Sequence, residues 1–404
     1  MVFAAEPEVF QPNPNSSAAS MGGGGADFKD SPHFRVYGAG TSADTSLKWL
    51  EGAYQCFVKE LGWRTSGLSR YAKDDKGPYY KENIYARAQL TGASGVMNTD
   101  ERSGYSWVQA VRGSVAQPQV VVHEYGHALT YHENNWVDQG NTGAYWEPLA
   151  NWFADTYLTS PLCAAARANY SQAEGRSIID LRKVIGQSYR VLVDGTPNNG
   201  NYYEAWPFMT YLTNNPDNYA GLGKDTMRDW IRKYKVRSNE TPLHALQTVA
   251  GATKVSKIMG RYWARMAYVD IGHKSANAMF TQQRKTLQYG NVDAAGDGSY
   301  KVKAARAPRY YGASIIPLKG TGQITVAVKA PSEFVATLAI KSGSSVKYVD
   351  LEAGSGSATV GAGEEATLVV ANTPEKLIKF DPFKIPAEVA KGLDFTVKIT
   401  GATA

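Results

Sequence analysis

The sequence has few cysteines and histidines, and it has no long apolar run. Its 404 residues include two cysteines and six histidines. Cys56 and Cys163 can form one disulfide or remain free thiols, and the sequence does not decide between these states. No apolar run reaches the roughly twenty residues that a membrane-spanning helix needs. We therefore expect no membrane partner.

The sequence also lacks a strong charge imbalance. Its net charge is +6, and charged residues make up 20% of it, which is typical of globular proteins. No nucleic-acid-binding module is recognisable, so we expect no nucleic-acid partner. The densest basic run, Arg232 to Arg237, follows a helical pattern and is typical of a solvated helix end. Nothing indicates association, so we expect a monomer.

The chain divides into three stretches by composition. Residues 1–32 lack a basic start and a long apolar core, and their Pro, Asn, Ser and Gly content predicts a disordered leader. Residues 33–305 predict a mixed sheet and a helix over residues 121–136, followed by a mainly helical part. Residues 306–404 form short β-rich runs separated by Gly, Ser and Pro, as in an all-β sandwich. The expected fold class is therefore α+β.

Three of the six histidines lie within ten positions, in the stretch HEYGHALTYH from residue 123 to 132. On a helix, His123 and His127 project from one face, about one turn apart. Two imidazoles in this arrangement can bind one zinc ion, and Glu124 between them can act as general base toward an attacking water. The alternative is an amphipathic helix that carries histidines by chance.

A catalytic zinc site needs a third protein ligand, and the sequence offers three candidates. Glu133 lies ten residues after His123, but no Gly precedes it to turn the chain back. His132 is out of register by one. Glu147 begins a second helix after a loop rich in turn residues. We favour Glu147, with the more distal polar residues of this helix, Asn151 or Asp155, holding the far N–H of a ligating histidine.

The HEYGH motif, followed after about twenty residues by a helical glutamate, resembles the gluzincin, or thermolysin-like, branch of zinc metallopeptidases. The resemblance covers residues 104 to 155 and implies a zincin-like domain with His123, His127 and Glu147 as ligands. It also implies Glu124 as base and an antiparallel edge strand upstream, which GYSWVQAV at 104–111 fits. The sequence departs from thermolysin-like enzymes at Asn151, where they carry Asp.

The whole layout, with its β-rich end, also resembles a poorly characterised family of secreted HExxH proteins. We therefore expect a secreted zinc metalloendopeptidase that acts on a peptide, protein or glycoprotein substrate. The alternatives are a zinc enzyme acting on a glycan-bearing or other non-peptide substrate, and a catalytically silent binding module. The intact Glu124 argues against the binding module, because such a module needs no base.

The transition state needs a further donor to stabilise the oxyanion. Four residues could supply it, and we favour the first of them because it follows a Gly- and Asn-rich turn: Tyr203, Tyr202, Tyr145 and His244. Tryptophans near the motif could line a groove for glycans or aromatic side chains, although core packing is favoured for the last: Trp136, Trp146 and Trp152.

Overall fold

The computed structural model describes residues 6–197 and 201–404 and has an α+β fold. The chain forms two compact units. The first unit consists of residues 1–137, 146–178 and 227–236, and the second of residues 138–145, 179–226 and 237–404. Within the described ranges, no helix combines the length and the apolar composition that a bilayer span requires.

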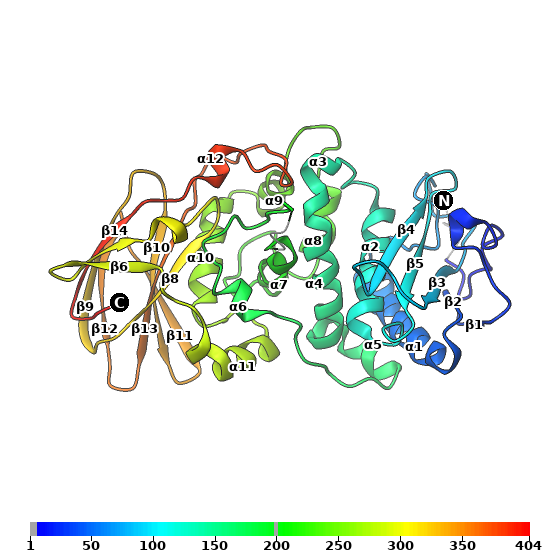
Figure 1. The fold of residues 1–404 in the computed structure, drawn as a ribbon, viewed down its shortest axis with the longest axis horizontal. Helices are drawn as coiled ribbons and strands as arrows, with labels where there is room; N and C mark the ends of the chain where they lie inside the picture. The colour runs from blue at the N-terminus through cyan, green and yellow to red at the C-terminus, as the bar shows by residue number, and fades with distance from the viewer. Residues whose placement is uncertain (1–5, 198–200) are drawn as a thin grey trace. The chain divides into compact units, whose positions relative to one another are not determined.

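The first unit contains a five-stranded mixed sheet (Figure 1). Its strands are β1 (Phe28–Asp30), β2 (Phe34–Tyr37), β3 (Glu82–Arg87), β4 (Gly95–Asp100) and β5 (Tyr105–Val111). They lie in the order β1-β2-β3-β5-β4, and β2, β3 and β5 run parallel. The outer strands β1 and β4 form the two edges of the sheet, and each is antiparallel to its neighbour.

The longest helix of the first unit is almost completely buried. The helices of this unit are α1 (Ala43–Tyr54), α2 (Pro118–Glu133), α4 (Trp146–Thr159), α5 (Ala164–Asn169) and α8 (Thr226–Arg232). Helix α2 begins with Pro118, whose ring suits the first turn, and it ends at Asn134, which adopts the left-handed conformation. It packs between β4 and β5 on one side and α4 on the other (Figure 1). Its polar residues are therefore held inside the unit.

A glycine sets the separation between α2 and α4. A Cβ atom on Gly126 would lie 2.7 Å from Cδ2, 2.8 Å from Cβ and 2.9 Å from Cγ of Phe153 on α4. Phe153 is itself fully buried against Phe57 and Trp63. The two helices can therefore approach this closely only because residue 126 has no side chain.

Residues 6–32 differ from the expected disordered leader, because they pack against the first unit. Phe10 is 2% exposed, and its ring contacts the rings of His33 and Tyr79. Met21 is equally buried, and its carbonyl accepts a hydrogen bond from the hydroxyl of Tyr85 at 2.8 Å. The leader contains only a few apolar side chains, but these insert between aromatic rings and order the segment.

A disulfide joins Cys56 and Cys163, which resolves the choice that the sequence left open. Cys56 lies in the π-helical continuation of α1, η3 (Gln55–Glu60), and Cys163 ends the 3-10 turn η5 (Pro161–Cys163) after α4. Both cysteines are completely buried. The bond closes a sequence separation of 107 residues and so restrains the first unit from its N-terminal helix to the end of α4.

The second unit combines helices with two antiparallel sheets. Its helices are α3 (Gln139–Thr142), α6 (Leu181–Val184), α7 (Trp206–Asn214), α9 (Pro242–Ala250), α10 (Val255–Met266), α11 (Lys274–Gln283) and α12 (Ala387–Ala390). One sheet has the order β11-β10-β13-β8 and the other β12-β9-β14-β7-β6. The strands are β6 (Val292–Gly296), β7 (Ser299–Val302), β8 (Ala313–Leu318), β9 (Gly322–Lys329), β10 (Val335–Ser342), β11 (Ser345–Asp350), β12 (Ser355–Val360), β13 (Glu365–Ala371) and β14 (Thr396–Thr400).

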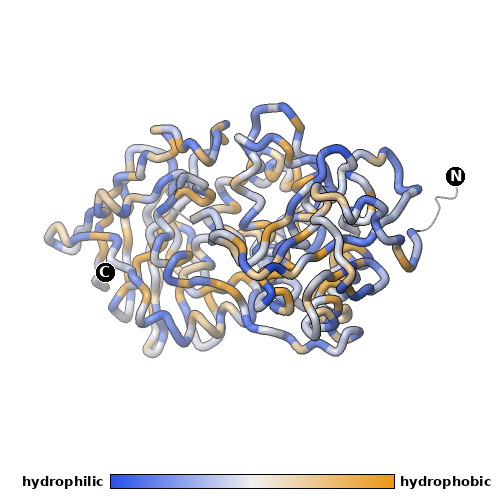
Figure 2. Tube along the Cα trace, turned by 45° about the vertical axis from the view of Figure 1, so that its right-hand side comes forward, coloured by the Kyte–Doolittle hydropathy of each residue, from blue (hydrophilic) through white to orange (hydrophobic). Residues whose placement is uncertain are grey.

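The two sheets share one apolar core, which is compatible with the expected β-sandwich. Leu338 and Leu368 from one sheet and Val326 and Ile399 from the other belong to this core. Buried and exposed residues alternate along strands such as β9 and β14. Figure 2 shows hydrophilic and hydrophobic segments following one another along the chain near the C-terminus.

The compact units do not follow the expected boundary between residues 305 and 306. The β6–β7 hairpin lies before this boundary, yet it joins the second sheet through β14. Helix α10 also belongs to the second unit, because it packs against β10 and β13. The sequence pattern located the β-rich run but not the helices that pack on it.

The Gly126 contact yields a prediction about stability. In Gly126→Ala the new methyl group must displace Phe153 or move α4, and overpacking of this kind typically costs about 1–3 kcal/mol. We expect a lower midpoint in urea unfolding monitored by circular dichroism. Gly113→Ala is the matched control, since nothing lies within 4 Å of a Cβ atom at that position. Equal unfolding midpoints for the two variants would contradict the close helix contact.

Candidate metal centre

The candidate site is built by two neighbouring helices of the first unit. Helix α2 places His123 and His127 one turn apart, and Glu147 lies in the first turn of α4. Because Gly126 lies between the histidines in sequence, the close helix contact occurs beside them and brings Glu147 within reach. The ligand atoms of these three residues all lie within 4.8 Å of one another.

The three potential ligand atoms form a nearly equilateral triangle. The Nε2 atoms of His123 and His127 are 3.1 Å apart, and Oε2 of Glu147 lies 3.1 Å from the first and 3.5 Å from the second. Metal–ligand bonds of about 2.0–2.1 Å in tetrahedral geometry place the ligand atoms about 3.3–3.4 Å apart. Two imidazoles and one carboxylate are also a donor set that zinc favours. The residues present therefore fit a zinc ion.

Asn151 fixes the tautomer of one histidine. Its Oδ1 lies 2.9 Å from Nδ1 of His123. An amide oxygen can only accept a hydrogen bond, so Nδ1 of His123 carries the proton and donates it. Nε2 therefore keeps its lone pair, directed at the centre of the triangle. Nδ1 of His127 is buried and has no hydrogen-bond partner in residues 6–197 and 201–404.

The charges of the cluster favour a cation. Burial opposes ionisation of Glu147, but hydrogen bonds and attraction to His123 and His127 outweigh it and lower the pKa of the carboxyl. Burial likewise opposes protonation of His127, yet the hydrogen bond to Glu147 and its charge raise the pKa of that imidazole. Each shift reflects a carboxylate that faces histidine nitrogens, where a metal ion would take the place of a proton.

Glu124 lies beside the triangle and against the sheet. Only 6% of Glu124 is exposed. Burial raises the pKa of its carboxyl, and the neighbouring His127 and His123 partly offset this. A Cβ atom on Gly95 of β4 would lie 2.7 Å from Cγ and 2.9 Å from Cδ of Glu124, so the side chain packs directly on the strand backbone. A buried carboxyl with a raised pKa suits a general base that works near neutral pH.

The structure corrects the expected position of the edge strand. Residues 104–111 were expected to form it, but β5 (Tyr105–Val111) is an inner strand between β3 and β4. The antiparallel edge is β4, whose sequence GVMNTD has few of the β-branched and aromatic residues that signal a strand. The contact of Gly95 with Glu124 places this edge beside the Glu124 carboxyl.

The other two candidate ligands have structural partners. Glu133 receives hydrogen bonds from Nε and Nη2 of Arg232 at 2.7 Å and from the backbone N–H of Arg64 at 2.9 Å. His132 is fully buried, its Nε2 lies 3.0 Å from the hydroxyl of Ser106, and burial lowers its pKa to about 3. Neither residue belongs to the cluster of ligand atoms.

The oxyanion candidates Tyr203 and His244 belong to the second unit and have contacts of their own there. Tyr203 lies in the 3-10 segment η6 (Asn201–Ala205) of the second unit, where its ring packs on Tyr202 at 4.6 Å. Nδ1 of His244 accepts a hydrogen bond from the backbone N–H of Thr241 and caps α9. An oxyanion role for Tyr203 stays a prediction, and part of the turn that suggested it lies outside the described residues.

Three further candidates are core residues: Tyr145, Trp136 and Trp152. Tyr145, also in the second unit, is 2% exposed, and burial raises the pKa of its hydroxyl. Trp136 and Trp152 are almost completely buried in the first unit, where Trp152 contacts Phe57 and Trp63. Trp146 is partly buried, and its indole N–H donates to the carbonyl of Trp136 at 3.1 Å. The tryptophans near the motif thus contribute mainly to packing inside the first unit and less to the lining of a groove.

Comparison with known proteins places the chain in a family. Residues 25–333 match the model of a family of unknown function, DUF6055. The chain belongs to the DUF6055 family. The matched range contains the whole candidate metal centre and the β4 edge, and it ends before β10. No curated protein matches the chain. Membership in DUF6055 carries no activity with it, so the function must be argued from the site.

The ligand assignment yields a paired prediction. Glu147→Ala removes one of the three ligand atoms and should weaken zinc binding by more than the 10–100-fold that loss of an outer hydrogen-bond partner typically causes. Glu133→Ala should leave zinc affinity unchanged. It should instead destabilise the fold by about 1–3 kcal/mol, because Arg232 and the Arg64 N–H lose their acceptor. Zinc titration and urea unfolding of both variants separate these effects, and loss of zinc in Glu133→Ala would refute the assignment.

The partner of His123 yields a second prediction. Asn151→Ala removes the acceptor that orients the imidazole and should weaken zinc binding about 10–100-fold. Asn151→Asp restores an acceptor and should restore binding. Asp155→Asn is the control on the same helix face, because Asp155 accepts instead from the Ser177 hydroxyl and the Ile178 N–H. Unchanged affinity in Asn151→Ala would show that this hydrogen bond does not position His123.

Proposed function

We propose that the chain is a zinc-dependent hydrolase whose first unit is a zincin-like domain that cleaves peptide bonds. The observation that carries the proposal is the triangle of ligand atoms from His123, His127 and Glu147, with edges of 3.1, 3.1 and 3.5 Å. A buried glutamate beside the triangle adds the second component that hydrolysis requires. A binding module would not need this base.

The chain's own residues have distinct tasks in the reaction. A bound zinc ion would supply Lewis acidity, which polarises a carbonyl and acidifies a water molecule. Glu124 takes a proton from the attacking water on its carboxylate and delivers that proton to the leaving amine. Its burial between α2 and the β4 backbone excludes bulk water from the carboxylate. Asn151 holds His123 in the tautomer that presents Nε2.

The β4 edge supports a peptide substrate rather than a glycan. An edge strand presents backbone N–H and C=O groups that an extended peptide can pair with. Because Gly95 of β4 contacts Glu124, a peptide added along this edge would pass beside the base. The exposed Val96 on the same strand offers an apolar contact for such a peptide. A sugar chain has no comparable row of groups with which to pair.

Secretion is part of the same proposal. The buried disulfide between Cys56 and Cys163 supports it, because disulfides persist in oxidising compartments and are rare in the cytosol.

The proposal predicts the behaviour of Glu124→Gln. This substitution keeps the size of the side chain, and Glu124 is not a ligand, so zinc content and the unfolding midpoint should stay unchanged. Loss of the base should reduce peptide hydrolysis by about 10²–10⁴-fold. We would measure cleavage of a peptide library by mass spectrometry with the zinc-loaded protein.

The control variant is Glu8→Gln, which changes an exposed glutamate of the same unit. It should cleave the library as the parent protein does. Equal hydrolysis by Glu124→Gln and the parent would overturn the assignment of the base. Absence of cleavage by the zinc-loaded parent on both the peptide library and glycopeptides would overturn the proposed hydrolase.

A further inference from the structure

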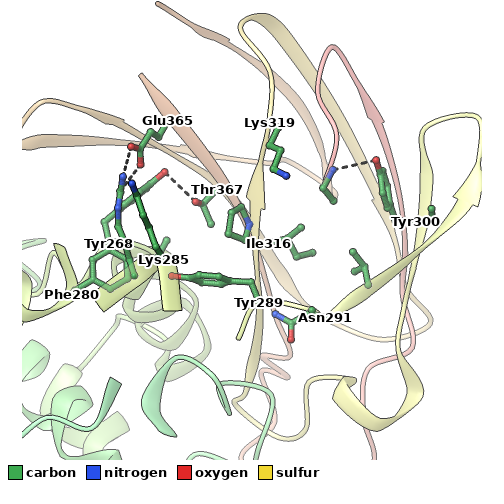
Figure 3. Close-up of a pocket in the computed structure, with 17 residues that line it drawn as sticks. Tyr268, Phe280, Lys285, Tyr289, Asn291, Tyr300, Ile316, Lys319, Glu365 and Thr367 are labelled. Atoms are coloured by element: carbon green, nitrogen blue, oxygen red, sulfur yellow. Dashed lines mark hydrogen bonds and ion pairs between the residues drawn. The ribbon is translucent and has the colours of Figure 1, made fainter. Parts of the chain in front are cut away.

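A large cavity lies in the second unit, and none of its lining residues belongs to the candidate metal centre. Its volume is about 720 Å³, within the range of pockets that hold small molecules. It is bounded by α11, the β6–β7 hairpin and the ends of β8 and β13 (Figure 3). No residue of the first unit lines it.

The charged side chains that line the cavity are mostly cationic. Arg284 forms a bidentate pair with Glu365, and the nearby charge of Lys285 also helps to lower the pKa of the Glu365 carboxyl. Lys285 and Lys319 are exposed, and neither forms an ion pair with the described part of the chain. Figure 3 shows the Lys319 side chain directed toward the space above Tyr289. The cavity therefore favours an anionic ligand.

The uncharged lining interleaves apolar and polar groups. Ile316 and Pro317 offer apolar surface, and the partly buried ring of Tyr289 lies across the cavity (Figure 3). The Tyr289 hydroxyl has no hydrogen-bond partner within residues 6–197 and 201–404. Burial raises the pKa of Tyr289 to about 12, so this hydroxyl stays protonated and can donate to a ligand.

This mixture distinguishes among anionic ligands. A fatty acid carries one carboxylate, which can pair with only one of the two lysines, and its chain would cover the Tyr289 hydroxyl with hydrocarbon and leave it without a hydrogen bond, which is unfavourable. A sugar ring has an apolar C–H face that packs on an aromatic ring, and hydroxyls at its edge that accept and donate hydrogen bonds. An acidic sugar adds the negative charge that the lysines attract.

We propose that this cavity binds a short acidic oligosaccharide, with a sugar ring on Tyr289 and its anionic groups at Lys285 and Lys319. The acidic group can be a carboxylate or a sulfate ester, because an ammonium group binds both. The second unit thus gives the protein a carbohydrate-binding site that is independent of the metal centre.

The test is isothermal titration calorimetry of the full chain at low salt. The acidic probes are tetragalacturonate, which carries carboxylates, and a heparin tetrasaccharide, which also carries sulfates. Maltotetraose is the neutral probe and decanoate is the amphiphilic one. We expect at least one acidic probe to bind, both maltotetraose and decanoate to bind more weakly, and binding of the acidic probe to weaken as salt is added. The stronger of the two acidic probes identifies the acidic group.

The variants locate the site. Lys319→Gln and Lys285→Gln should each weaken binding of the acidic probe about tenfold, and Tyr289→Ala should weaken it by a similar factor. Lys329→Gln, an exposed lysine on β9 that does not line the cavity, should have no effect. Circular dichroism and unfolding midpoints establish that each variant is folded. Tyr289→Phe, which keeps the ring and loses only the hydroxyl, replaces Tyr289→Ala if that variant unfolds, and it too should bind more weakly.

Three results would overturn the proposal. The first is no binding of either acidic probe at about 1 mM, the weak limit for a specific site. The second is equal or tighter binding of maltotetraose or decanoate. The third is binding of the acidic probe that Lys319→Gln and Lys285→Gln leave unchanged. Glu124→Gln should bind the acidic probe as the parent does, so failure of the proposed hydrolase would not affect this result.

Discussion

The close contact between α2 and α4 at Gly126 is the constraint on which the candidate site depends. Ligand atoms from two helices can face one metal ion only if the helix axes are near and their rotation is fixed. Phe153 packs between Phe57 and Trp63 and contacts Gly126. This contact fixes the distance between the helix axes and the rotation of the helices. His123 and His127 flank this contact on α2, and Glu147 and Asn151 precede it on α4. The glycine inside the HEYGH motif is thus as much a part of the site as the histidines.

A second close approach joins the site to the sheet. Gly95 on β4 admits the Glu124 side chain against the strand backbone, which buries the carboxylate and raises its pKa. The same contact places the edge strand of the sheet beside Glu124, the proposed base. Three elements of one compact unit, α2, α4 and β4, therefore bring together the residues on which the proposed function rests: the candidate ligands, the proposed base and the edge strand.

The sequence predicted most of this site because helical spacing is a strong local rule. The pairing of His123 with His127 followed from their four-residue spacing, and the role expected of Glu124 followed from the HExxH pattern. Glu147 followed from the turn-rich loop before the next helix. The edge strand could not be predicted, because GVMNTD owes its strand conformation to pairing with β5 rather than to its own residues. The order of residues 6–32 and the packing of α10 on β10 and β13 are likewise tertiary effects. They rest on contacts between residues far apart in the sequence, such as Phe10 with Tyr79.

The most direct test of the central claim is anomalous X-ray diffraction at the zinc absorption edge from crystals of the purified chain. The account predicts one strong peak in the first unit, about 2.0–2.2 Å from the Nε2 atoms of His123 and His127 and from the Glu147 carboxylate. A peak at other residues would contradict the account. So would the absence of a peak in crystals grown with excess zinc.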